Sequence, residues 1–356
     1  MKILIRVDSS REIGTGHTMR CLSLAIGLKE KCAEITFLSR DATGILVDLV
    51  RKQGFEVLVL PPGSGKKFHY EVAHSRWLGV SQKIDARESI AAAGSDWDLV
   101  VVDHYGISST WENEIRTHTK KILVIDDIAD REHNCDFLVD QNLYNNATSR
   151  YDGKISSGAK LLLGPKFALL RHEFRLARNK LSRKNGLKKI LVFYGGADPA
   201  NETQKALDGL LALKKGAIGV TVVCGPSNPH LGGLEKFCAK HSGFHLLHSV
   251  SNMAELMMDA DLSLGGGGTT TWERCALGLP AIVTIMAENQ REMAMAAEGA
   301  GVQIVAGDTS RVSSEMLGGL VAKFSENPEL LAAMTKSALC LVDGLGVTRV
   351  IQEVSK

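Results

Sequence analysis

The sequence predicts an α/β protein of two doubly wound, Rossmann-like domains that face each other across a central cleft. Its 356 residues are enough for two domains, and a hydrophobic content of 44% is enough for two cores. Short apolar runs alternate with helical patterns along the whole chain, which is typical of βαβ units and parallel sheets. The alternation breaks near the middle, and each half opens with its own strand and glycine turn.

Each predicted strand is a short apolar run, as expected for strands buried on both faces of a sheet. In the first half these runs lie at 3–7, 35–38, 57–60, 99–102 and 122–125. In the second half they lie at 190–193, 220–223, 245–248, 262–264, 281–285 and 302–305. The stretch between the halves is basic and contains Asn, Ser and Gly. We therefore expect an N-terminal domain over 1–170, a linker over 171–189 and a C-terminal domain over 190–356.

Composition and charge narrow the class of ligand. A net charge of +2 argues against nucleic acid, because binding to a phosphate backbone normally needs a clustered basic face. The 7 cysteines are scattered without a CxxC pair, which indicates reduced thiols and a cytoplasmic protein. No uncharged apolar run is long enough for a stable membrane insertion, although a reversible contact with a membrane surface stays open. We expect a small-molecule ligand.

A glycine run followed by a helix start is the most informative segment of the C-terminal half. Four consecutive glycines, 265–268, separate an apolar strand from an apolar helix, and such a turn suits close approach of an anion to backbone N–H groups. We expect Gly266, Gly267, Gly268, Thr269 and Thr270 to contact phosphates, with Glu273 on ribose hydroxyls. The competing interpretation is a tight turn with ordinary capping threonines.

Two further segments of this half are candidates for the same ligand. Gly195 and Gly196 directly follow the first strand of the half and can contact a pyrophosphate, or form a plain turn capped by Asp198. Asn289 and Gln290 follow the strand at 281–285, where amide side chains suit phosphate or sugar oxygens. A simple helix N-cap is the competing account of Asn289.

His17 is the candidate catalytic residue of the N-terminal half. It follows Gly14-Thr15-Gly16 at the predicted start of the first long helix. A helix N-terminus disfavours imidazolium, so a histidine there tends to be neutral and able to act as a base. We expect Gly16 to contact the substrate and Arg20, one turn later, to reach an acid or a substrate group; a solvated arginine is equally compatible.

Polar side chains end three of the predicted strands in this half. Asp8 follows the first strand, Asp103 and Tyr105 follow the run at 99–102, and Asp126 follows the run at 122–125. Because doubly wound folds bind ligands at the carboxyl ends of their strands, we expect these side chains to bind substrate. Capping of the next turn is the alternative for each aspartate.

Several common cofactor motifs are missing from the sequence. Neither half has GxGxxG after its first strand, which disfavours a dinucleotide, and no GxxxxGK[ST] occurs. No HxH, HExxH or spaced Cys/His set indicates a metal site. We expect neither a cofactor nor a metal.

With these motifs in place, the chain resembles the UDP-2,4-diacetamido-2,4,6-trideoxy-β-L-altropyranose hydrolases (PseG family) of pseudaminic acid biosynthesis. The resemblance extends over essentially the whole chain. It is carried by 6–10 (RVDSS), 13–17 (IGTGH), Arg20, 102–105 (VDHY), 125–131 (IDDIADR), 135–136, 140–142, 265–268, Thr271, Glu273, 278–280 and 289–290. The C-terminal group is also similar to the donor site of the N-acetylglucosaminyltransferase that makes lipid II, so the N-terminal groups select the hydrolase.

The resemblance implies a GT-B-like fold, with UDP bound mainly by the C-terminal domain and the sugar directed at the loop that bears His17. It implies cleavage of the anomeric C–O bond with inversion, with water as acceptor and without metal. A UDP-sugar-dependent glycosyltransferase of the same fold and a catalytically silent nucleotide-sugar-binding protein are the alternatives. The basic segment 61–76 keeps the transferase open as an acceptor site, although it also suits a solvated loop.

Overall fold

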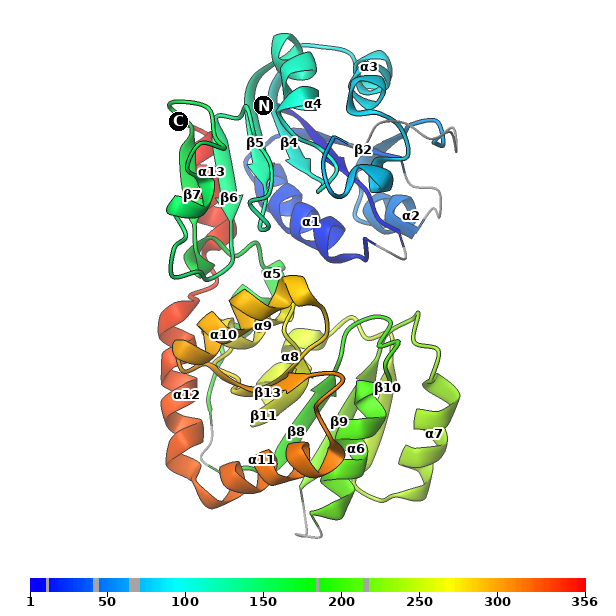
Figure 1. The fold of residues 1–356 in the computed structure, drawn as a ribbon, viewed down its shortest axis with the longest axis vertical. Helices are drawn as coiled ribbons and strands as arrows, with labels where there is room; N and C mark the ends of the chain where they lie inside the picture. Colours follow the sequence, from blue (N-terminus) through cyan, green and yellow to red (C-terminus); the bar gives the residue numbers. More distant parts are fainter. Residues whose placement is uncertain (11–12, 41–44, 64–70, 184–185, 214–217) are drawn as a thin grey trace. The chain divides into compact units, whose positions relative to one another are not determined.

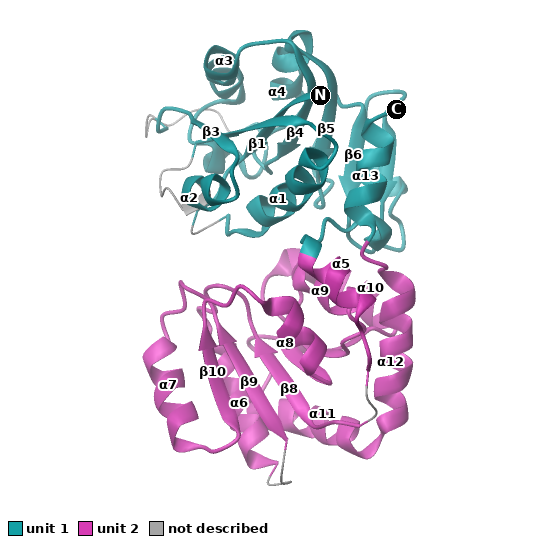
Figure 2. Ribbon diagram, turned by 180° about the vertical axis from the view of Figure 1, so that it is seen from behind, with its two compact units in different colours: residues 1–172, 345–356 teal, residues 173–344 magenta. Residues whose placement is uncertain are grey.

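Two parallel sheets organise the chain into two units in the computed structural model, which describes residues 1–10, 13–40, 45–63, 71–183, 186–213 and 218–356. Unit 1 comprises residues 1–172 and 345–356, and unit 2 comprises residues 173–344 (Figure 2). In each unit helices flank a sheet whose strands all run parallel (Figure 1).

The sheet of unit 1 has the order β3-β2-β1-β4-β5-β6-β7. Its strands are β1 (Lys2–Val7), β2 (Glu34–Ser39), β3 (Glu56–Val59), β4 (Trp97–Asp103), β5 (Thr119–Ile125), β6 (Phe137–Asp140) and β7 (Lys160–Leu163). Its helices are α1 (Gly16–Lys29), α2 (Ile45–Lys52), α3 (Gln82–Ala93), α4 (Ser109–Ile115) and the C-terminal α13 (Gly346–Val354). Short 3₁₀ turns lie at Ser75–Leu78, Arg116–His118, Ser149–Tyr151 and Pro165–Phe167.

The sheet of unit 2 has the order β10-β9-β8-β11-β12-β13. Its strands are β8 (Lys189–Phe193), β9 (Gly219–Cys224), β10 (Phe244–His248), β11 (Leu262–Gly266), β12 (Ala281–Ile285) and β13 (Gln303–Asp308). Its helices are α5 (His172–Asn179), α6 (Glu202–Ala212), α7 (Leu231–Lys240), α8 (Met253–Asp259), α9 (Thr270–Ala276), α10 (Arg291–Gly299), α11 (Ser314–Glu326) and α12 (Pro328–Leu341), with a 3₁₀ turn at Glu288–Gln290.

The central strands are buried on both faces, as the apolar runs predict. In β1, Ile3 and Ile5 pack into one apolar cluster of unit 1, while Leu4 packs into the cluster on the other face. Successive side chains of a strand point to opposite faces, so an uninterrupted apolar run serves both. Arg6 is fully buried in the same strand and needs charged partners there.

Every predicted strand is present, and the two-domain α/β prediction is confirmed. The sequence analysis missed β6 and β7 at one edge of the first sheet. Each has only four residues, and the chain between them forms the 3₁₀ turn Ser149–Tyr151 where a βαβ unit would have a helix. The strand–helix alternation that identified the other strands is therefore lost there.

The C-terminal helix α13 packs on unit 1, which differs from the predicted C-terminal domain of 190–356. Val350, Ile351 and Val354 join the apolar cluster that contains β1 and α1. Gly27 of α1 makes the close approach possible: a Cβ there would lie 2.7 Å from Val347 Cγ1. The helical periodicity of 346–354 indicates an apolar face but not which core that face covers.

The basic stretch predicted as a linker over 171–189 contains α5, and two of its arginines, Arg178 and Arg183, bind helix ends of unit 2. Arg178 donates to the carbonyls of Ala276, Leu339 and Val342, at the ends of α9 and α12. Carbonyls at a helix C-terminus lack partners within the helix and attract cations. The positive charge of Arg178 is therefore used in packing.

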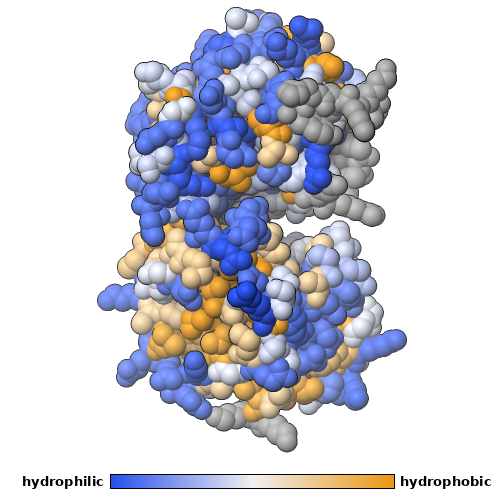
Figure 3. All heavy atoms as spheres, in the orientation of Figure 1, coloured by the Kyte–Doolittle hydropathy of each residue, from blue (hydrophilic) through white to orange (hydrophobic). Residues whose placement is uncertain are grey.

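The surface of unit 2 carries apolar side chains on one face, in the region of the edge strand β13 (Figure 3). Among the described residues, the segment Pro328–Val354 is long and apolar enough to cross a membrane by length and composition. The structure divides it into α12 and α13, and both helices contribute to cores through side chains such as Met334 and Val350.

We expect Ile351→Ala to destabilise unit 1 by about 2–4 kcal/mol, because it removes buried methyl groups that pack against α1. Hydrogen exchange followed by mass spectrometry should show faster exchange in β1 and α1 and unchanged protection in β8 and β11. Leu330→Ala, at a 37% exposed position of α12, is the matched control with little expected effect. Loss of protection in unit 2 alone would contradict the placement of α13.

Candidate functional site

Both sheets reverse their strand order at one point, between β1 and β4 in unit 1 and between β8 and β11 in unit 2. Ligands of open parallel sheets bind beyond the carboxyl ends of the strands at such a reversal. The His17 loop and residues 103–105 follow β1 and β4, and the two glycine turns follow β8 and β11. Most of the predicted site residues therefore lie at the reversal point of their unit, while Asp126 follows β5 and Asn289 and Gln290 follow β12.

His17 lies in the first turn of α1 and is oriented by a buried aspartate. Its Nδ1 lies 2.5 Å from Asp103 Oδ1, and 8% of the histidine is exposed. A carboxylate only accepts hydrogen bonds, so Nδ1 carries the proton of this bond, and in the neutral imidazole Nε2 then presents a lone pair. Gly14, with φ of 74°, makes the tight loop before the helix, and Gly16 opens the helix with free space where a Cβ would be.

Arg20 holds Asp103 from the other side. Its Nε and Nη2 donate to Asp103 Oδ2 and Oδ1 at 2.6 Å, and Nη1 donates to Asp127 Oδ2 at 2.7 Å. Burial alone would raise the pKa of Asp103, but Arg20 and His17 outweigh it and hold that pKa well below its usual range. Asp103 is therefore ionised and able to hold the histidine tautomer.

Tyr105 completes this cluster. Its ring meets the His17 ring edge-on at 4.6 Å between centroids, and its hydroxyl donates to Asp127 Oδ1. Trp77 stacks on the other part of the Tyr105 ring at 5.8 Å between centroids, and His74 lies 4.5 Å from Trp77. A row of aromatic rings thus extends from His17, and such rings suit the apolar face of a sugar or an acetamido methyl group.

Asp8 and Asp126 lie at strand ends as predicted, but each is held in a buried ion pair. Arg6 makes two bonds to Asp8 at 2.5 and 2.9 Å, and Arg131 binds Asp126 at 2.9 Å. Burial, the largest single effect, raises the pKa of each carboxyl, but its arginine together with a nearby histidine, His104 for Asp8 and His133 for Asp126, brings the net pKa below its usual range. Their assignment to substrate contact stays a prediction.

Sequence reasoning missed Asp127, Trp77 and His74 as members of the His17 cluster. The pair Asp126-Asp127 offered two carboxylates, and only the three-dimensional fold shows that Asp127 is the one bound to Arg20 and Tyr105. Trp77 and His74 belong to the segment 61–76 and the turn after it, which reach Tyr105 only through tertiary packing. Residues 64–70 of that segment lie outside the described residues.

The glycine run of unit 2 forms the end of β11 and the turn into α9. Gly265 and Gly266 belong to the strand, and Gly267, Gly268 and Thr269 make the turn. A Cβ at Gly265 would lie 2.3 Å from the carbonyl oxygen of Phe193, so close packing within the sheet requires this glycine. Such a Cβ on Gly268 would meet only the end of the Gln290 side chain, at 3.8 Å. The exposed part of the turn is therefore open to a ligand.

The other predicted residues of unit 2 lie at different places around this turn. Gln290 lies beside it: its Oε1 is 3.7 Å from a Cβ placed on Gly267 and accepts from Met286 N–H. Asn289 is exposed on the same 3₁₀ turn. Thr270 opens α9, in which Glu273 is half-buried one turn from Thr269, and no side chain caps this helix.

The turn after β8 contains two glycines with open space around them and an aspartate that caps the following helix. Gly195 has φ of 91°, which favours glycine, and a Cβ at Gly195 or Gly196 would meet nothing within 4 Å. Asp198 accepts from the N–H groups of Glu202 and Thr203 at 2.9 Å and so caps α6. The capping role of Asp198 is confirmed, and the phosphate role of the glycines stays a prediction.

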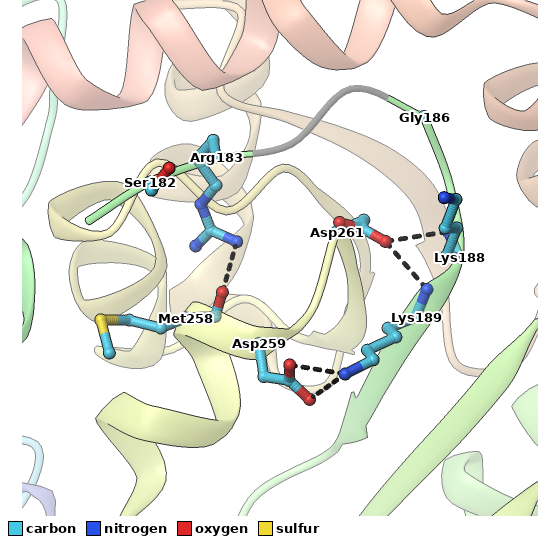
Figure 4. A pocket seen from close by; sticks show the side chains of 8 residues that line it. All are labelled: Ser182, Arg183, Gly186, Lys188, Lys189, Met258, Asp259 and Asp261. Carbon is cyan, nitrogen blue, oxygen red and sulfur yellow. Dashed lines mark hydrogen bonds and ion pairs between the residues drawn. The ribbon is translucent and has the colours of Figure 1, made fainter. Parts of the chain in front are cut away.

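Two features of the described residues bear on a metal site and on a further ligand site. Among the described residues, no group of three or more His, Cys, Asp or Glu side chains is placed to hold a metal. A pocket lies at the amino ends of β8 and β11, the opposite edge of the sheet from the glycine turns (Figure 4). Its charged groups pair with one another: Lys189 binds Asp259 at 2.6 Å, and Asp261 accepts from two backbone N–H groups.

Comparison with known proteins agrees with this fold. Residues 189–351 match the Glycosyltransferase family 28 C-terminal domain. The crystal structure of MurG from Acinetobacter baumannii is 14% identical, has a TM-score of 0.68 and covers 100% of this chain and 99% of its own. UDP-GlcNAc 2-epimerase from Neisseria meningitidis, bound to UDP-GlcNAc, has a TM-score of 0.64 at 12% identity over 100% of both chains. The predicted GT-B-like fold is confirmed.

Relatives that are similar in sequence include the following two. An uncharacterized protein of Methanocaldococcus jannaschii is 30% identical over 82% of this chain, and the match spans 57% of that protein, so this chain corresponds to little more than half of it. The UDP-2,4-diacetamido-2,4,6-trideoxy-β-L-altropyranose hydrolase of Campylobacter jejuni is 29% identical over 73% of this chain and 83% of its own length.

Asp140, a buried carboxyl close to Asp127 of the His17 cluster, predicts a dependence of the stability of unit 1 on pH. Asp140 accepts from Arg150 and Tyr151, at 2.7 and 3.0 Å. Burial, and then the charge of Asp127, raise the pKa of Asp140 to about 7. A carboxyl whose pKa is higher in the folded than in the unfolded state stabilises the fold when it is protonated. This stabilisation is complete below the unfolded pKa of about 3.9 and is lost as the pH rises towards 7.

We therefore expect the free energy of unfolding of unit 1 to lose up to about 1.4 kcal/mol per pH unit from Asp140 between about pH 4 and 7. Asp140→Asn should remove this slope, measured as hydrogen-exchange protection of β5 and β6 across that range. The pKa values of Asp8, Asp103 and Asp126 are lowered, so those groups titrate below this window. An identical pH dependence in both proteins would refute the assignment.

Proposed function

We propose that this protein is a UDP-sugar hydrolase that cleaves the anomeric C–O bond with water and releases UDP and the free sugar with inversion. The observation that carries the proposal is the His17–Asp103 pair, in which Nδ1 is bound to an ionised carboxylate. In the proposal the imidazole is neutral and Nε2 is the acceptor. In this proposal, unit 2 holds the nucleotide and His17 of unit 1 serves the attacking water.

The chemistry of the step suits a histidine base. Nε2 accepts a proton from water as the water oxygen bonds to C1, and the C1–O bond to the diphosphate breaks with its electrons staying on UDP. The nearby carboxylates suit this role less well. Asp8, Asp103 and Asp126 are buried and paired with arginines, which hold their pKa values down and make them weak bases.

The leaving group needs stabilisation of negative charge, which the turn after β11 is suited to give. Gly268 and Thr269 lie on the open part of this turn beside Gln290, and backbone N–H groups of such a turn are the kind of preorganised donor that stabilises developing charge. UDP is a far better leaving group than an alcohol, so the two-carboxylate arrangement of common glycosidases is not required. This step uses neither a cofactor nor a metal.

The identity of the sugar is the most specific part of the proposal. The Campylobacter jejuni relative supports a UDP-linked 2,4-diacetamido-2,4,6-trideoxy sugar, and so a place in pseudaminic acid biosynthesis. The aromatic row of Tyr105, Trp77 and His74 beside His17 fits the methyl groups of such a substrate. The family 28 match supports the second candidate, a UDP-sugar-dependent glycosyltransferase of the same fold.

Product analysis tests the proposal. Purified protein is incubated with UDP-2,4-diacetamido-2,4,6-trideoxy sugars and UDP-GlcNAc, without acceptor and after chelation of divalent metals, and products are identified by mass spectrometry and NMR. We expect UDP and free sugar of inverted anomeric configuration from a diacetamido substrate. UDP release only after an acceptor is added would establish a transferase. UDP-sugar binding without turnover would establish a catalytically silent binding protein. Activity that depends on added magnesium would establish a metal site.

We expect His17→Ala to lower kcat by about 10²–10⁴-fold, because it removes the general base. UDP affinity should stay within about twofold, since the proposed nucleotide site uses unit 2 alone. His118→Ala, which replaces another histidine of unit 1, is the control. Loss of UDP affinity with kcat preserved would instead make His17 a phosphate contact.

We expect Glu273→Ala to weaken UDP binding by about 1–3 kcal/mol through loss of charge-assisted hydrogen bonds to the ribose. Calorimetry with UDP and 2′-deoxy-UDP tests the contact itself: the substitution should reduce the difference between the two ligands. Glu329→Ala, at an exposed position of α12, is the matched control. An undiminished preference for UDP in the variant would remove Glu273 from the site.

A further inference from the structure

Arg274 lies directly beneath the glycine turn of unit 2. It is 2% exposed, and its Nη1 and Nη2 both lie 3.3 Å from the carbonyl oxygen of Gly266. Nη2 also donates to Thr271 Oγ1 at 3.0 Å. A Cβ placed on Gly265 would be 3.4 Å from Nη1. The guanidinium therefore contacts the turn from its buried side.

The charge of Arg274 is not balanced as it is for other buried arginines. Arg6, Arg20 and Arg131 each form ion pairs with aspartates of unit 1, and their pKa values are raised. Within the described part of the chain, no carboxylate forms an ion pair with Arg274, and burial lowers its pKa to about 10. It is still a cation at neutral pH, and a buried cation without a counter-charge is costly.

Arg183 of unit 2 provides the informative comparison. It also lacks a carboxylate, and burial lowers its pKa to about 10. Its donors, however, bind the carbonyls of Met257, Met258, Ala260 and Leu277, where α8 and α9 end and carry partial negative charge. Arg274 has one carbonyl and one hydroxyl, both at 3.0–3.3 Å. Arg274 therefore meets less negative charge at the glycine turn than Arg183 meets at its helix ends.

We propose that Arg274 is a positioning residue for a nucleotide diphosphate, whose phosphates supply the counter-charge that the buried guanidinium lacks. This rests on the proposed function. By holding the Gly266 carbonyl and the Thr271 hydroxyl from the buried side, Arg274 fixes the conformation of the turn at which the diphosphate binds.

The comparison of UDP with uridine tests this role, because the two ligands differ only in the diphosphate. Their affinities are measured by calorimetry and by displacement of UDP for the wild type, Arg274→Gln, Arg274→Lys and Lys336→Gln. Arg274→Gln should weaken UDP at least about tenfold and uridine less than about twofold. Arg274→Lys keeps the charge without the forked contact, so its UDP affinity should fall about two- to tenfold. Lys336→Gln removes an exposed charge of the same unit and should change neither affinity.

Each outcome has one meaning. Equal losses for UDP and uridine, or an unchanged UDP affinity in Arg274→Gln, overturn the inference. If thermal denaturation shows that Arg274→Gln does not fold, Arg274→Lys decides, and a wild-type preference for UDP over uridine in that variant overturns the inference. A wild-type protein that binds neither ligand refutes the proposed function itself, which the wild-type titration alone reveals.

Discussion

The candidate site of unit 1 depends on one buried carboxylate, Asp103. It accepts two bonds from Arg20 and one from His17, and all three groups are nearly inaccessible to solvent. In such surroundings an unpaired carboxylate would take up a proton, and the histidine would lose the partner that fixes its tautomer. Arg20 keeps Asp103 ionised, and Asp127 and Tyr105 keep Arg20 and the imidazole in place.

The two units solve the problem of buried charge in different ways. In unit 1, arginines at the carboxyl edge of the sheet meet aspartates, so the charges cancel within the protein. In unit 2, Arg178 and Arg183 meet helix-end carbonyls, and Arg274 meets little negative charge at all. The second arrangement electrostatically favours an anionic ligand, and the first fixes the orientation of the His17 imidazole.

Much of the candidate site could be predicted because the residues follow strands. His17, Arg20, Asp103 and Tyr105 were all expected, and the fold brings them into one cluster. The choice between Asp126 and Asp127 could not be made, since adjacent residues at a strand end point to different sides and the partner of each is distant in sequence. Arg274 carried no signal, because a buried and an exposed arginine of a short helix look alike in a sequence.

The sequence by itself determined the fold class and the strands in long alternating patterns, because local apolar periodicity records burial whatever the partner. It also determined which strand ends carry glycines, histidine and aspartates. Only the tertiary structure decided that α13 packs on unit 1, that the basic stretch 171–189 binds helix ends, and that β6 and β7 extend the first sheet. These features depend on which distant surface an element meets, and a periodic pattern specifies that a face is apolar or charged without specifying its partner.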